Sequence, residues 1–148
     1  MANSNLLIRT FAMGIMMTMT STVNARVPQY LVCETTRIDV SMNEFSEAVC
    51  KLMLQALERR FGSPIELVNT AKLQENAKLG SAGQWVVLRM SLPNPHLAQA
   101  QLFLGSAKEL TAGGGQSGPV VSTHMNDAEL NLGNSESLVN GLISNFPI

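Results

Sequence analysis

One stretch of the sequence, Asn43–Phe61, constrains the fold more than any other. It reads NEFSEAVCKLMLQALERRF. Its apolar residues recur at intervals of three and four positions, which is the spacing of one face of an α-helix. These apolar positions are Phe45, Ala48, Val49, Leu52, Ala56, Leu57 and Phe61. The stretch is therefore predicted to be an amphipathic helix that packs its apolar face on the rest of the domain.

Both ends of this helix carry signals of their own. Ser41 is followed three residues later by Glu44, and this spacing predicts a capping box at the N-terminus. At the other end, Gly62 and Pro64 follow two arginines whose charge suits the carbonyl end of a helix. The helix is therefore expected to stop at Gly62.

The first 25 residues have the pattern of a signal peptide. Arg9 is the only charged residue among them, residues 11–23 are mildly apolar, and the sequence Val-Asn-Ala ending at Ala25 suits signal peptidase. We expect cleavage after Ala25, which leaves a single α+β domain over residues 26–148 in the periplasm or outside the cell. The segment is too short and too polar to span a membrane. The alternative is an N-terminal helix of a cytosolic protein.

The chain has two cysteines, Cys33 and Cys50. In an oxidising compartment, such a pair predicts one disulfide bond. Cys50 lies at the edge of the apolar stripe of the helix, where it can meet the segment before the helix. In a cytosolic protein the two residues would instead be half-buried thiols. Metal binding is disfavoured because no histidine lies near either cysteine.

The clearest strands are predicted in the middle of the chain. Residues 85–92 and residues 97–104 both alternate apolar and other side chains, and a Pro-rich turn separates them. They are expected to form an antiparallel pair with one buried face. Further elements are predicted as a strand at 30–40, a short strand at 65–68, a solvated helical turn or loop at 70–79, a flexible connection at 106–117, a third strand of the sheet at 118–125 and an amphipathic helix at 135–146.

These elements together predict an α+β fold. A small antiparallel sheet of about three to four strands, mainly residues 84–125, would be packed by the amphipathic helix near the N-terminus and by the C-terminal helix. With 148 residues and 45% hydrophobic content, the chain has the length and the apolar material for one such core. Its formal net charge of -1, without any run of Lys or Arg, argues against a nucleic-acid partner.

The glycine-rich segment 113–118 does not match a phosphate-binding loop. Such a loop ends in Gly-Lys-Ser/Thr and leads into a helix, whereas Gly118 here leads into Pro119 and a predicted strand. The segment is interpreted as a flexible connection, with a binding edge as the alternative. Trp85 and Arg89 share one face of a predicted strand, where they form either a ligand platform or part of the packing on that side of the sheet.

Three polar residues, His124, Asp127 and Glu129, form the densest cluster of potential catalytic groups or metal ligands. An imidazole beside carboxylates suits general acid–base or metal chemistry. The short spacing is no established motif, however, and polar residues are commonplace in a turn after a strand. His96 is interpreted as a solvated turn residue. His124 would support catalysis if it lay within hydrogen-bonding reach of the two carboxylates in a concave pocket.

The sequence thus favours an exported, non-catalytic binding or accessory protein, because its informative positions all serve folding. Its partner would be a protein or a small molecule, and no cofactor or metal is expected. The alternative is a small metal-dependent or hydrolase-like enzyme that uses His124, Asp127 and Glu129.

Overall fold

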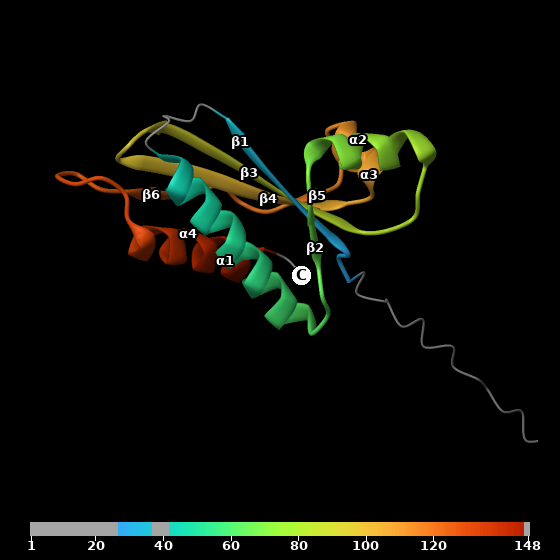
Figure 1. Ribbon diagram of the computed structural model, residues 1–148, viewed down its shortest axis with the longest axis horizontal. Helices are drawn as coiled ribbons and strands as arrows, with labels where there is room; N and C mark the ends of the chain where they lie inside the picture. Colours follow the sequence, from blue (N-terminus) through green and yellow to red (C-terminus); the bar gives the residue numbers. More distant parts are fainter. Residues whose placement is uncertain (1–26, 37–41, 147–148) are drawn as a thin grey trace, which may run out of the picture.

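The computed structural model describes residues 27–36 and 42–146 (Figure 1). The predicted signal peptide, residues 1–25, lies outside the described residues. The elements in chain order are β1 (Tyr30–Thr36), α1 (Asn43–Phe61), β2 (Glu66–Val68), α2 (Thr70–Leu79), β3 (Trp85–Asn94), β4 (Leu97–Gly105), α3 (Ala107–Thr111), β5 (Gln116–Ser117), β6 (Val121–His124) and α4 (Leu132–Asn145).

The strands form one six-stranded sheet in the order β2-β1-β3-β4-β5, and β6 also pairs with β4. The predicted hairpin is confirmed, since β3 and β4 are antiparallel with Val86 opposite Leu104. β6 pairs antiparallel with β4, as expected of a third strand. The sheet is nevertheless mixed, because β1 runs parallel to both β2 and β3. Parallel pairing needs a crossover connection, and α1 provides it between β1 and β2.

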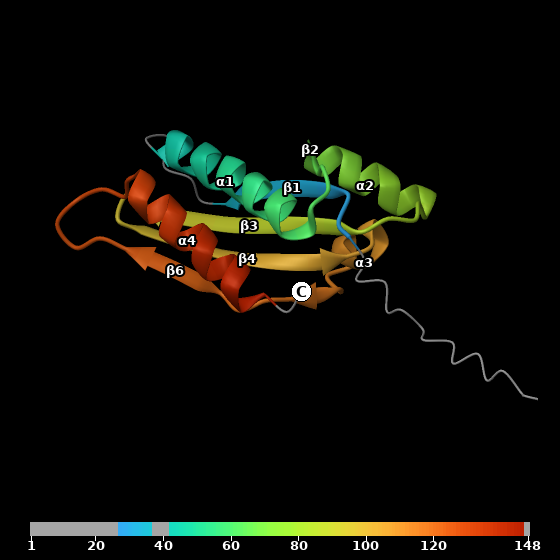
Figure 2. The same ribbon diagram turned by 90° about the horizontal axis from the view of Figure 1, so that it is seen from below.

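Helices cover both faces of this sheet, so the predicted α+β class is confirmed. Figure 2 shows α1 and α4 side by side along the sheet, and Figure 1 shows α2 and α3 together at one end. The larger core lies between the sheet and the helices α1 and α4. A smaller core on the opposite face joins α2 and α3 to the sheet, and its fully buried residues include Val32, Trp85 and Val87.

Helix α1 has the predicted bounds, and its buried face shares Phe45, Val49 and Leu57 with the predicted stripe but also includes Met53. The buried residues are Phe45, Val49, Met53 and Leu57, spaced four apart. Met53 is fully buried although it was not predicted as part of the apolar stripe, and Leu52 is only half-buried. The reason is that Leu52 lines the groove between α1 and α4 instead of facing the core centre.

The two ends of α1 compare differently with the prediction. Gly62 ends the helix in the left-handed conformation, with φ of 63°, and its backbone N–H donates to the Glu58 carbonyl oxygen at 2.8 Å. The residue that precedes the helix is Met42, whose side chain makes no capping hydrogen bond. Ser41, which was predicted to cap the helix, lies outside the described residues. The C-terminal signal is therefore confirmed, and the N-terminal capping box stays a prediction.

The predicted disulfide between Cys33 and Cys50 is present, with the two Cα atoms 6.1 Å apart. It ties β1 to α1 at the edge of the larger core, where Cys33 is partly buried. β1 ends at Thr36, and the rest of the strand predicted to reach residue 40 lies outside the described residues. Within the described residues, no helix is long and apolar enough to cross a bilayer.

Three segments are more regular than their composition suggested. Residues 70–79 form a complete helix, capped by the Asn69 side chain, which accepts from the Lys72 backbone N–H at 2.9 Å. The expected flexible connection contains α3, which starts in a capping box between Ser106 and Glu109. The C-terminal helix starts at Leu132 and not at residue 135, because Asn131 caps it three residues earlier.

Candidate functional site

The three predicted site residues all lie on the surface near one end of the sheet. His124 is the last residue of β6, whereas Asp127 and Glu129 belong to the loop that leads to α4, and all three are exposed. In the part of the chain that the structure describes, no hydrogen bond joins them and no group of three potential ligands is placed to hold a metal ion. The concave, hydrogen-bonded arrangement that would support catalysis is therefore not formed by these side chains.

The loop that carries Asp127 and Glu129 is fixed by the turn between β3 and β4. The His96 ring nitrogen Nδ1 lies 2.8 Å from the Ala128 carbonyl oxygen, and the Leu130 backbone N–H donates to the Pro95 carbonyl oxygen at 2.9 Å. His96 is thus exposed in a turn, as predicted, but it also holds a loop that is distant in sequence. This anchoring places Leu130, which is 8% exposed, in the larger core.

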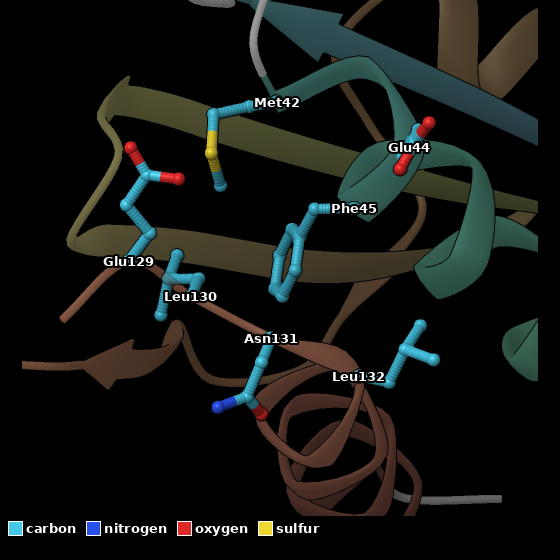
Figure 3. A pocket seen from close by; sticks show the side chains of 7 residues that line it. All are labelled: Met42, Glu44, Phe45, Glu129, Leu130, Asn131 and Leu132. Carbon is cyan, nitrogen blue, oxygen red and sulfur yellow. The ribbon is translucent and has the colours of Figure 1, made fainter.

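A pocket of about 200 Å³ lies beside this loop, where α1 and α4 both begin (Figure 3). We call it the helix-start pocket. It is lined by Met42, Glu44, Phe45, Glu129, Leu130, Asn131 and Leu132. The buried side chains of Met42, Phe45 and Leu130 make an apolar floor. Leu132, by contrast, is 69% exposed at the edge of the pocket.

Two carboxylates give the rim of the helix-start pocket a negative charge. Figure 3 shows the Glu129 and Glu44 side chains on opposite sides of the Phe45 ring. Both are exposed, and neither forms an ion pair with another of the described residues. The side chain of Asn131 is already used in the capping box with Asn134. An apolar floor with a negative rim suits a side chain that has an apolar part and a cationic end.

On the opposite face of the sheet, Trp85 fills a core. It is fully buried and stacks on the Tyr30 ring at 4.3 Å between centroids. Arg89 is half-exposed, its Nε donates to the Glu34 carboxylate at 2.9 Å, and its guanidinium lies 4.5 Å from the Phe103 ring centroid. The packing interpretation is therefore confirmed for Trp85, which is not available to a ligand.

The glycine-rich segment has structural roles at both of its ends. Gly115 has a φ of 89°, and a Cβ there would meet the Leu104 carbonyl oxygen at 2.7 Å. At Gly118, a Cβ would meet the Phe146 ring at 2.7 Å, and the glycine carbonyl accepts from the Gln101 side chain at 2.8 Å. Glycine is thus required where this segment approaches β4 and the end of α4.

The described residues therefore define an α+β protein with a mixed sheet and helices on both faces. This fold is PelC-like. It matches the PelC dodecamer from Paraburkholderia phytofirmans with a TM-score of 0.54 and 9% identity, covering 80% of this chain and 86% of that chain. A point variant of the same PelC protein gives a TM-score of 0.50, 10% identity and coverage of 80% and 88%. No family model matches the sequence, and no curated protein matches it significantly. At this identity the likeness concerns the fold alone.

Proposed function

We propose that the chain is an exported, non-catalytic accessory protein that works as an assembly of several copies. The observation that carries the proposal is the PelC-like fold, because the solved PelC protein is a dodecamer and the likeness spans 80% of this chain. The partner of each copy is then, first of all, another copy of the same chain.

Two features support export to an oxidising compartment. Residues 1–25 have the charge and apolar pattern of a signal peptide, with a cleavage site after Ala25. The Cys33–Cys50 disulfide belongs to the kind of bond that persists in the periplasm or outside the cell, whereas reducing agents keep cytosolic thiols free. The working protein is accordingly residues 26–148, located in the periplasm or secreted.

The lining of the helix-start pocket supports a binding role. Its described lining residues offer two exposed carboxylates around an apolar floor, which suits a ligand that has a cationic end and an apolar part. The alternative, a small metal-dependent or hydrolase-like enzyme that uses His124, Asp127 and Glu129, draws less support from the pocket, because Glu129 is the one of the three among its described lining residues.

Native mass spectrometry of the protein exported from its own host tests the proposal in one measurement. The expected species contains several copies, each of which begins at Arg26 and weighs two hydrogens less than the reduced chain. A monomer at all concentrations would refute the assembly. Subunits that retain residues 1–25 would refute processing by signal peptidase.

A further inference from the structure

The C-terminal end of α2 exposes an apolar side chain, Leu79, next to a cationic one, Lys78. Leu79 is 72% exposed, more than any other large apolar side chain in residues 27–36 and 42–146. Lys78 beside it is exposed and makes no ion pair with the described residues. Gly80 then turns the chain away in the left-handed conformation, with φ of 62°, so both side chains stand at the tip of the helix. The helix end thus offers an apolar side chain and a positive charge side by side.

The helix-start pocket has the complementary properties. Its floor is apolar, its exposed Leu132 extends the apolar surface, and its rim carries Glu44 and Glu129. Pairing of the pocket with itself in a second copy is unfavourable, because the two negative rims would then repel each other. A partner surface must instead supply an apolar side chain together with a positive charge.

We propose that the helix-start pocket of one copy receives the tip of α2 from the next copy. This inference rests on the proposed self-assembly and names the surfaces that perform it. Leu79 packs on the floor beside Leu132, and the Lys78 ammonium pairs with the carboxylates of Glu129 and Glu44. Burial of the leucine supplies affinity, whereas the charge pair fixes the orientation and makes the contact sensitive to salt.

The positions of the two surfaces determine how copies are joined. Figures 1 and 2 both place the tip of α2 and the start of α1 and α4 at opposite ends of the molecule. A contact between different surfaces at opposite ends is heterologous, so every copy donates one tip and accepts another. Copies therefore join head to tail, and the chain of copies closes into a ring where the rotation between neighbours allows it.

The test is a charge swap, measured by sedimentation velocity over a range of concentrations. The protein is purified from the periplasm of a host that expresses the full chain. Glu129→Lys and Lys78→Glu should each raise the dissociation constant between copies by about tenfold, because each replaces an attraction with a repulsion. The double variant should recover most of the lost affinity. In the unaltered protein, raising the salt concentration should weaken assembly.

Matched controls reverse exposed charges on α1 that are outside both surfaces. Lys51→Glu and Glu47→Lys should leave the dissociation constant unchanged. Because all the altered side chains are exposed, urea unfolding should show that every variant is folded.

Assembly that survives all the reversals would overturn the proposed contact but leave the proposed function standing. Two weakened single variants without recovery in the double variant would also overturn the direct pairing. A protein that is monomeric without any substitution would instead overturn the proposed assembly itself.

Discussion

The disulfide between Cys33 and Cys50 allows a stability prediction with a defined magnitude. The two residues are 17 positions apart, and their Cα atoms are separated by 6.1 Å, a distance common among native disulfides. In the chain-entropy relation, closing a loop of this length removes freedom from the unfolded chain worth about 3 kcal/mol at 25 °C. Replacing both cysteines with alanine should therefore lower the free energy of unfolding by about 3 kcal/mol.

The measurement is urea unfolding followed by circular dichroism, with the oxidised protein and the double alanine variant compared under the same conditions. In a domain of this size, a loss of 3 kcal/mol corresponds to a fall in Tm of about 10 to 15 °C. The m-value should rise slightly, because the unfolded chain without the crosslink exposes more surface. The unaltered protein in a thiol reductant serves as the control, since it lacks the bond but keeps both side chains.

Two results would contradict this reasoning. One such result is a free energy of unfolding of the double variant within about 0.5 kcal/mol of that of the oxidised protein. The segments of β1 and α1 would then already stay close together in the unfolded state, so that the bond would restrict the unfolded chain little. If the reduced protein stays as stable as the oxidised one while the double variant does not, the stabilisation comes from side-chain packing and not from the crosslink.

Four further substitutions, one of them with a control, test the packing. Leu57→Ala should lower the free energy of unfolding by about 3 to 5 kcal/mol because Leu57 is fully buried, whereas Leu52→Ala should lower it by about 1 kcal/mol. Equal losses of the two variants in urea unfolding would contradict the observed core face of α1. Gly141→Ala should destabilise by about 1 kcal/mol despite better helix propensity, because the new methyl group would lie 2.9 Å from a β6 side chain. Ser137→Ala on the exposed face of α4 is its control, with a Tm expected to stay the same or rise. Arg89→Met should lower the free energy of unfolding by about 1 kcal/mol, because it removes the ion pair with Glu34. This loss should shrink as salt is added, and a loss that is the same at all salt concentrations would mean that it comes from packing instead.

The elements that could be predicted are those whose pattern is local. The bounds of α1 follow from its apolar spacing and from Gly62, and the β3–β4 hairpin follows from alternation on both sides of a Pro-rich turn. The disulfide followed from the number of cysteines and the expected compartment. Each of these inferences needed only neighbouring residues or a count, so tertiary contacts could not overturn them.

The parts that could not be predicted depend on contacts between distant segments. Nothing in the sequence of β1 states that it pairs in parallel with β3, because direction is decided by the path of α1 and α2 around the sheet. Which face of α1 is buried likewise depends on where α4 lies. For this reason Met53 is fully buried in the core, whereas Leu52, which was predicted to be there, lines the groove toward α4. The capping box of α3 was present as Ser106 and Glu109, but its glycine-rich surroundings favoured a loop.

The helix-start pocket shows why a surface pocket is harder to predict than the fold that carries it. Its lining residues come from two segments, 42–45 and 129–132, which are separated by most of the chain. They meet because the turn at His96 holds the loop before α4 against the end of the hairpin. The predicted cluster of His124, Asp127 and Glu129 therefore pointed to the right region of the surface, but it did not reveal which residues Glu129 would lie beside. Glu129 lines the pocket together with Phe45 and apart from His124, and this placement could be read only from the folded chain.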